Sequence, residues 1–303
     1  MKIYTELTPS AGSTAVALGS FDGLHLGHRA VIAQAVDESG LIPTVLTFTH
    51  NPLEDLGGST GGELMTQQQK TEVLESFGVK QLYLIQFASI MHFSAEQFVT
   101  EVLENVCHAK KVCCGFNFTF GDGGRADSSD LSRLCDACGI RTAVMDAVLQ
   151  GGEPISSTRI RTLVAQGNMD AARELLGRPY SLLGPVRHGQ KLGRRLGTPT
   201  LNQEIPKTFV MPRFGVYVSR VSLSGGVYCG VTNVGVRPTV DGHHITAETW
   251  LPDYDGPEFY GADVRTELLH FLRPEQKFAS VEALGEQIRC DGGKAKDFWR
   301  KGK

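Results

Sequence analysis

The first half of the chain alternates short apolar runs with segments whose apolar residues recur at helical spacing. This pattern extends from about Thr14 to Gly177. The runs predict strands and the segments between them predict helices. Strands are expected over residues 14–20, 41–48, 79–87, 110–116 and 141–148, and helices over 28–40, 66–78, 94–106 and 128–138. Such alternation predicts a Rossmann-like α/β domain, with a parallel sheet and helices on both faces.

The pattern changes after two further helices, which begin near Ser157 and Asn168. The second is expected to end at Gly177, a residue type typical of the position after a helix. Beyond it, short strands alternate with Gly, Pro and Asp over residues 182–189, 214–224, 226–235, 244–251 and 262–272. Many short strands with little helix predict an antiparallel barrel or sandwich, and only the tail from Ser280 has a helical pattern. We therefore expect two domains, 1–180 and 181–303.

Composition narrows the function classes. The 30 Lys and Arg residues against 33 Asp and Glu leave a net charge of −3, which argues against a nucleic-acid partner. The N-terminal segment lacks the apolar core of a signal peptide, and no apolar run reaches the ~18 residues that would span a membrane. Seven scattered cysteines favour reduced thiols and a cytoplasmic location. Glycine, at 35 of 303 residues, is well above the typical ~7% and indicates tight turns or backbone close to a ligand.

The segment GSFDGLHLGH, residues 19–28, follows the first predicted strand and opens a helix. Ligands of open α/β sheets bind at this edge, and a helix N-terminus offers N–H groups to a phosphate. His25 and His28 are three residues apart and share one helix face. The pair alone would fit an ordinary polar surface, and a zinc site is disfavoured because no HExxH motif or ligand cysteine is nearby. Gly23 and Gly27 in this strand–turn–helix context favour phosphate binding.

GSFDGLHLGH resembles the HxGH motif of the nucleotidyltransferase superfamily. Together with TFTHNP (47–52), GFNFTFG (115–121) and ISSTRIR (155–161), it resembles the first module of the prokaryotic bifunctional riboflavin kinase/FMN adenylyltransferase (FAD synthetase) family. The resemblance continues through the second half. It implies a nucleotidyltransferase domain followed by a β-barrel riboflavin kinase domain with a terminal helix. Riboflavin, FMN, FAD and ATP are then the expected ligands, with Mg²⁺ as cofactor. Separately, we expect a monomer or weak homo-oligomer.

Adenylyl transfer to FMN uses a phosphate that is already ionised, so catalysis reduces to alignment and stabilisation of charge. The resemblance makes His25 and His28 catalytic contacts of the ATP phosphates. It assigns the whole ATP site to Gly19, Phe21, Asp22, Gly23, His25, His28, Asn117, Ser156, Ser157, Thr158 and Arg161. A plain helix N-cap is the alternative for 156–161. His50 and Asn51 are not assigned to the site, because the family's acidic residue is missing at 48–52.

The second candidate site lies in GPVRHGQKLGRRLGTPTLN, residues 184–202. A glycine-rich basic loop can wrap phosphates, although it lacks the Walker A pattern, and a basic surface hairpin is the alternative. The segment resembles the riboflavin kinase motif GRxLGxPTxN. The resemblance implies ATP and Mg²⁺ contacts from Gly189, Gly193, Arg194, Gly197, Thr200 and Asn202, with Thr200 and Asn202 as the Mg²⁺ ligands. Two oxygen ligands suit Mg²⁺, which keeps several waters.

Riboflavin phosphorylation also needs a base, because its nucleophile is an alcohol. By resemblance that base is the catalytic Glu248 in ITAETWL, and the flavin contacts are Arg273 and Glu275 in FLRPEQKF. On composition alone Glu248 would be an exposed strand glutamate. Three other functions stay open: one active module only, a non-catalytic flavin-binding regulator, or a nucleotidyltransferase for another phosphorylated small molecule.

Four of the cysteines, at positions 113, 114, 135 and 138, could suggest a zinc site, but their positions argue against it. Cys113 and Cys114 are adjacent on a predicted strand, so their side chains point to opposite faces. Cys135 and Cys138 fall on a predicted helix. We therefore predict buried structural thiols.

Overall fold

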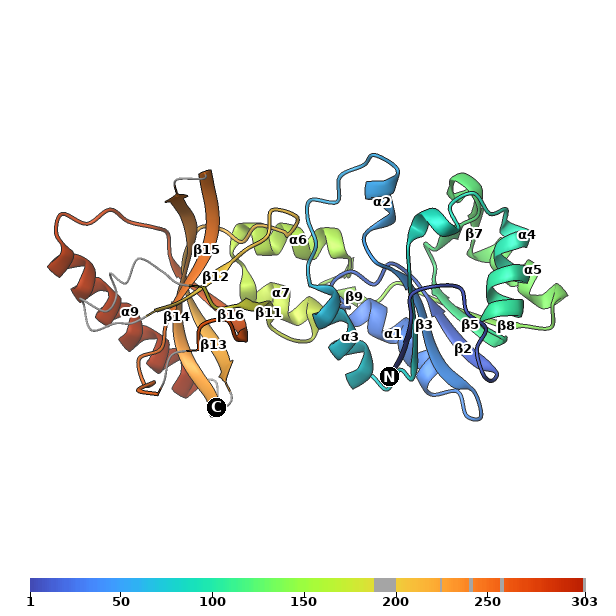
Figure 1. The fold of residues 1–303 in the computed structure, drawn as a ribbon, viewed down its shortest axis with the longest axis horizontal. Helices are drawn as coiled ribbons and strands as arrows, with labels where there is room; N and C mark the ends of the chain where they lie inside the picture. The colour runs from blue at the N-terminus through green and yellow to red at the C-terminus, as the bar shows by residue number, and fades with distance from the viewer. Residues whose placement is uncertain (188–199, 224, 240–241, 257–258, 302–303) are drawn as a thin grey trace. The chain divides into compact units, whose positions relative to one another are not determined.

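The computed structural model describes residues 1–187, 200–223, 225–239, 242–256 and 259–301 (Figure 1). It divides into two compact units, Met1–Ser157 and Thr158–Lys303. Each unit has its own sheet, in agreement with the two styles of sequence pattern.

The first unit is built on a six-stranded sheet in the order β1-β4-β3-β2-β5-β8. Every neighbouring pair is parallel. The strands are β1 (Lys2–Tyr4), β2 (Thr14–Leu18), β3 (Ile42–Phe48), β4 (Gln81–Ile85), β5 (Ala109–Gly115) and β8 (Arg141–Met145). The five predicted strands are confirmed. The edge strand β1 was not predicted, because three residues are too few to show a period.

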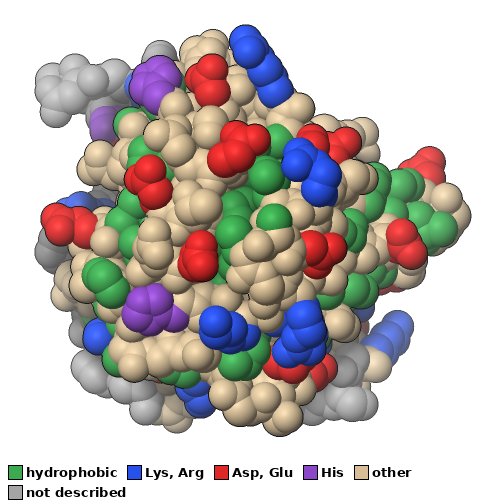
Figure 2. Space-filling model, turned by 90° about the vertical axis from the view of Figure 1, so that its right-hand side faces the viewer, with side chains coloured by type: hydrophobic (Ala, Val, Ile, Leu, Met, Phe, Trp, Pro, Cys, Tyr) green, Lys and Arg blue, Asp and Glu red, His purple; other side chains and the backbone are tan. Residues whose placement is uncertain are grey.

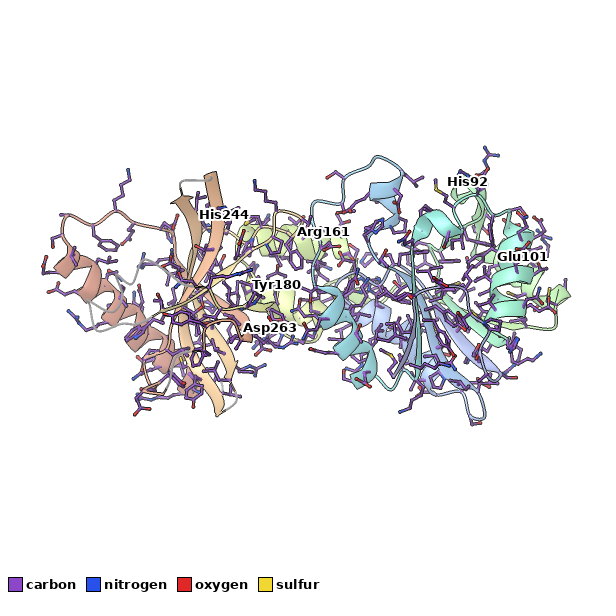
Figure 3. The ribbon with its side chains drawn as sticks, in the orientation of Figure 1. His92, Glu101, Arg161, Tyr180, His244 and Asp263 are labelled. Carbon is purple, nitrogen blue, oxygen red and sulfur yellow. The ribbon has the colours of Figure 1, made fainter. Side chains whose placement is uncertain are left out.

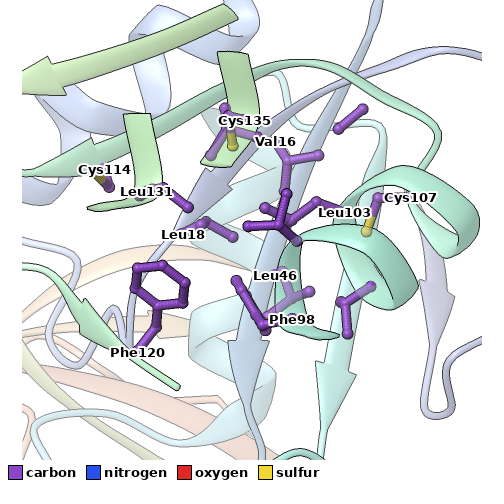
Figure 4. Packing of buried hydrophobic residues seen from close by; sticks show 14 of the residues in the cluster. Val16, Leu18, Leu46, Phe98, Leu103, Cys107, Cys114, Phe120, Leu131 and Cys135 are labelled. Carbon is purple, nitrogen blue, oxygen red and sulfur yellow. The ribbon is translucent and has the colours of Figure 1, made fainter. Parts of the chain in front are cut away.

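Helices cover both faces of this sheet. They are α1 (Leu26–Val36), α3 (Gln67–Ser76), α4 (Ala95–Gln97), which continues as the π-helix η2 (Phe98–Val106), and α5 (Ser128–Ala137). The central strand β2 is buried on both sides: Ala15 and Ala17 pack with α1 and α3, whereas Val16 and Leu18 pack with η2 and α5 (Figure 4). The predicted α/β class of the first domain is therefore confirmed.

Short elements complete the first unit. They are α2 (Pro52–Asp55), η1 (Phe87–Ser89), β6 (Thr119–Phe120), η3 (Asp122–Gly124), β7 (Ala126–Asp127), β9 (Leu149–Gln150) and β10 (Glu153–Pro154). β6 pairs with β7, and β9 with β10.

The cysteines behave as structural thiols. Cys113 and Cys114 belong to the two clusters on opposite faces of the sheet, as predicted. Cys135 is buried and Cys138 partly buried, and all seven are free thiols. Within the described ranges, no three His, Cys, Asp or Glu side chains are grouped so that they could hold a metal ion.

The boundary between the units falls after the first residue of α6 (Ser157–Gln166), and α7 (Met169–Leu176) follows in the second unit. Gly177 ends α7 in the left-handed conformation, with φ 71°. Figure 3 labels Arg161 on α6 and Tyr180 where the first strand of the next sheet begins.

An antiparallel sheet in the order β11-β16-β13-β14-β15-β12 forms the rest of the second unit. The strands are β11 (Tyr180–Pro185), β12 (Thr200–Glu204), β13 (Gly215–Leu223), β14 (Gly226–Thr239), β15 (Gly242–Trp250) and β16 (Asp263–Arg273). The sheet curls until its edges meet, where Arg187 pairs with Asn202. The terminal helix α9 (Val281–Lys301) packs on one face through Ala295, Phe298 and Trp299. The prediction of a barrel-like antiparallel sheet with a terminal helix is confirmed.

The face drawn in Figure 2 has mixed charge. Acidic and basic side chains are interspersed on it, which agrees with the near-neutral composition. Among the described residues, no helix combines the length and apolarity that crossing a membrane requires.

Candidate functional site

The first site lies at the carboxyl ends of two neighbouring strands. β2 is followed along one side of the sheet by β3 and β4, and on its other side by β5 and β8. The order in which strands are added therefore reverses between β2 and β5, although both strands run in the same direction, and open α/β sheets bind ligands at such a switch point. The GSFDGLHLGH segment follows β2, and Asn117 follows β5. The sheet order thus brings together two motifs about ninety residues apart, and Asn117 is exposed there.

Residues 19–25 form the β2–α1 turn, whose backbone is held in unusual conformations. Phe21, Gly23 and Leu24 have φ of 48°, 78° and 41°. Left-handed conformations cost non-glycine residues about 1 kcal/mol or more each. Phe21 and Leu24 are nevertheless buried, and a Cβ at Gly23 would lie 2.7 Å from Leu64 Cδ1. Packing therefore fixes the turn, as is typical of a functional site.

His25 and His28 share one face at the start of α1, as predicted. His25 is the N-cap of the helix, and its Nδ1 accepts the backbone N–H of His28 at 3.2 Å. The two rings stack with centroids 3.6 Å apart, and Phe21 packs edge-on against His28. Because Nδ1 of His25 accepts, the proton of the neutral ring is on Nε2. A donor of this kind suits a phosphate oxygen.

Asp22 and Ser157 support the turn. Asp22 Oδ1 accepts the backbone N–H of Leu64 at 3.1 Å, and Ser157 Oγ donates to the carbonyl of Asp22 at 2.8 Å. Ser157 starts α6, so this bond links the second predicted motif to the first across 135 residues. Ser156 is half-buried beside it, and Thr158 and Arg161 follow along α6.

His50 and Asn51 have structural partners. His50 Nε2 lies 2.9 Å from Asp55 Oδ1, and Asn51 Oδ1 accepts from the backbone N–H of Leu53 as the N-cap of α2. Both residues lie just beyond the carboxyl end of β3, next to β2.

Lys70 is a residue near this site that the sequence pattern did not single out. It is buried, and its Nζ donates to the carbonyl of Ser20 at 3.1 Å. Burial lowers the pKa of Lys70, while the carboxylates of Asp22 and Glu63 oppose that shift. The sequence shows only one lysine in a polar run on α3, so its burial is visible only in the folded chain.

The second site is a row of polar side chains across three strands. Asn202 on β12 lies opposite Glu248 on β15, and Glu248 lies opposite Asn233 on β14. Opposed residues of neighbouring strands share a face of the sheet. Thr249, next in sequence, is fully buried and bonds to Thr232 on the inner face. Alternation therefore places Glu248 on the opposite face.

Asn202 has the properties of a cation ligand. It is buried, and its Nδ2 donates weakly to the carbonyl of Thr200 at 3.4 Å. Within the part of the chain that the structure describes, its Oδ1 is buried without a hydrogen-bond donor. A buried oxygen of this kind fits Mg²⁺, which prefers oxygen ligands. Four further predicted residues lie outside the described residues: Gly189, Gly193, Arg194 and Gly197.

The predicted flavin contacts lie at the end of the same row. Asn233 Nδ2 donates to Glu275 Oε1 at 3.2 Å, and a Cβ at Gly235 would clash with that oxygen. Arg273 instead binds the buried carboxylate of Asp291 on α9, through Nε at 2.9 Å and Nη2 at 2.8 Å. Asn233 was not among the predicted site residues. It lies in the sequence TNVGVRPT, residues 232–239, where a polar amide follows a buried threonine on a predicted strand.

The fold and the two sites define a class of two-domain nucleotide-dependent transferase, with one site at an α/β switch point and the other on a curled β-sheet. Two family models match the chain: FAD synthetase over residues 7–159 and riboflavin kinase over residues 176–299. The chain belongs to the bifunctional riboflavin kinase/FMN adenylyltransferase family of enzymes, as its motifs had indicated.

Relatives with that name resemble the chain over nearly its whole length. The Listeria monocytogenes protein is 32% identical and the match covers 94% of this chain and 92% of the relative. The Haemophilus influenzae protein is 35% identical and the match covers 94% of each. A solved structure described as a macrolide-efflux protein from Streptococcus pneumoniae has a TM-score of 0.88 and 28% identity, covering 98% of this chain and 99% of that one.

Proposed function

We propose that this chain carries out two consecutive reactions of flavin cofactor synthesis in the cytoplasm. The domain 181–303 phosphorylates riboflavin with ATP to give FMN. The domain 1–180 transfers the adenylyl group of a second ATP to FMN, giving FAD and pyrophosphate. The observation that carries the proposal is that each unit retains its own set of polar side chains, the histidine pair at α1 and the row across β12, β15 and β14.

In the adenylyl transfer, the FMN phosphate attacks the α-phosphorus of ATP and pyrophosphate leaves. His25 and His28 contact the ATP phosphates and stabilise charge on the leaving group, helped by the N–H groups at the start of α1. Ser156, Ser157, Thr158 and Arg161 form the second phosphate contact, and Asn117 contacts the nucleotide. The rigid β2–α1 turn supports this role, since alignment is the main requirement.

In the kinase reaction, the terminal ribityl hydroxyl of riboflavin attacks the γ-phosphorus of ATP, and ADP leaves. Glu248 orients that hydroxyl and accepts its proton. Glu275 and Arg273 hold the flavin. This assignment is supported by the row of side chains, in which Glu248 lies between Asn202 and Asn233, and by the bond from Asn233 to Glu275.

Thr200 and Asn202 would hold Mg²⁺ in the kinase domain. When bound, Mg²⁺ offsets the negative charge of the ATP phosphates. The buried Oδ1 of Asn202 supports this role. The backbone bond from Arg187 to Asn202, 2.7 Å long, holds the residue at the point where the sheet edges meet.

A time course with riboflavin, ATP and Mg²⁺ tests the proposal. Separation of the flavins by chromatography should show FMN first and FAD afterwards. FMN without FAD would show that only the kinase domain is active. Formation of neither product would refute the proposed function.

Two variants separate the sites, and each serves as the control for the other. His28→Ala should abolish FAD formation while FMN still accumulates. Glu248→Gln should suppress FMN formation, while added FMN is still converted to FAD. If either folded variant loses both activities, the assignment of one reaction to each domain is wrong.

A further inference from the structure

Lys70 is a buried charged residue that no step above uses. It lies on α3, four residues after the N-cap Thr66, and only 8% of its surface is exposed. A buried ammonium group is costly unless it has hydrogen-bond acceptors and opposite charges nearby. Its hydrogen bond to the Ser20 carbonyl places it directly against the β2–α1 turn.

Two carboxylates face Lys70 from other segments. Asp22 belongs to the β2–α1 turn, and Glu63 to the segment before α3. Glu63 is itself faced by Glu54 and His50, and its pKa is raised by burial and by the charge of Asp22. The lysine is therefore the buried positive centre of a charge cluster that includes Asp22 of the turn.

Side chains from three different elements hold the carbonyls of this turn. The Ser20 carbonyl accepts from Lys70 and also from Thr47 Oγ1 on β3, at 2.9 Å. The Asp22 carbonyl accepts from Ser157 Oγ. Phe21, which has a left-handed backbone, lies between these two carbonyls. An isolated turn would relax from such a conformation, so these donors act together with the packing of Phe21 and Leu24 to maintain it.

We propose that Lys70 is a positioning residue for adenylyl transfer. By holding the Ser20 carbonyl, its ammonium group keeps the β2–α1 turn in its left-handed conformation, and so keeps His25 and His28 in place. The inference rests on the proposed function of the first domain.

Lys70→Met is the main test. The kcat for conversion of FMN to FAD should fall about tenfold or more, because small misplacements of a catalytic group are costly. The KM for FMN should change little, and FMN formation by the kinase domain of the same molecule should be unchanged. Lys70→Arg, which keeps the charge and the donor, should recover a large part of the lost kcat.

Three further measurements sharpen the test. Lys80→Met removes an exposed lysine of the same unit and should leave both activities unchanged. Thr47→Val removes the other donor to Ser20 and should cause a smaller loss than Lys70→Met. In the wild type, FAD formation should decline at alkaline pH as Lys70 loses its proton. In Lys70→Met this decline should be absent.

The outcomes separate the inference from the proposed function. A wild-type protein that makes no FAD from FMN refutes the proposed function. If the wild type is active, a Lys70→Met kcat within about twofold of it refutes the positioning role, because the change is smaller than misplacement would cause. Unfolding of the first unit in Lys70→Met, or failure of Lys70→Arg to recover activity, would likewise overturn the role.

Discussion

The buried ion pair between Arg273 and Asp291 should be essential to the stability of the second unit. Two guanidinium nitrogens of Arg273 bind Oδ2 of Asp291, and Gln287 donates to Oδ1 at 2.9 Å. The side chains of Arg273 and Asp291 are 14% and 1% exposed. Asp291→Ala would therefore leave the arginine charge largely buried without its partner.

The size of the effect follows from this burial. Removing one partner of a buried ion pair lowers the free energy of unfolding by about 3–5 kcal/mol. In a unit of about 150 residues, 1 kcal/mol corresponds to about 2–4 °C in Tm, so Asp291→Ala should lower Tm by about 6–20 °C. The riboflavin KM should also rise, because Arg273 is a proposed flavin contact.

Tryptophan fluorescence can follow this unit selectively. Both tryptophans of the chain, Trp250 and Trp299, lie in the second unit and pack in the cluster beneath α9. Asp253→Ala provides the matched control, since its ion pair with Lys296 is on the surface, with side chains 62% and 36% exposed. Exposed ion pairs of this kind contribute about 1 kcal/mol or less to the free energy of unfolding. If Asp291→Ala lowers Tm no more than this control, burial does not make the Arg273–Asp291 pair more important to stability than an exposed pair.

Three other changes have defined outcomes. Gly23→Ala forces a left-handed alanine at a cost of about 1–2 kcal/mol and a contact with Leu64. It should reduce FAD formation but not FMN formation, and unchanged FAD kinetics would contradict the rigid-turn argument. Gly235→Ala should displace the flexible Glu275 side chain and raise the riboflavin KM with little change in Tm; an unchanged KM would exclude a flavin contact by Glu275. Burial raises the pKa of the five buried thiols to about 11 or 12, so thiol labelling of the native protein at pH 8 should be dominated by the exposed Cys290 and lost in Cys290→Ser.

The alternating pattern of the first half was enough to predict an α/β domain, because apolar strands and amphipathic helices leave strong local signals. The motifs themselves were also local: the strand, turn and helix around His25 are contiguous in sequence. The prediction that Cys113 and Cys114 point to opposite faces needed only the period of a strand. In the second half, the glycine-rich pattern predicts a loop that includes Thr200 and Asn202, yet both residues lie on strand β12.

What the tertiary structure alone decided is which distant residues meet. The order of the sheet, rather than the order of the chain, brings the end of β5 beside the end of β2. Strand register places Glu248 between Asn202 and Asn233, and a shift of one residue would have turned its side chain to the other face. Lys70 shows most clearly what the local sequence pattern does not predict. Nothing in the polar run QQQK marks this lysine as buried, because its environment comes from Ser20 and Asp22, about fifty residues away. Local patterns determine the elements and their chemistry, whereas long-range packing determines which side chains share a site.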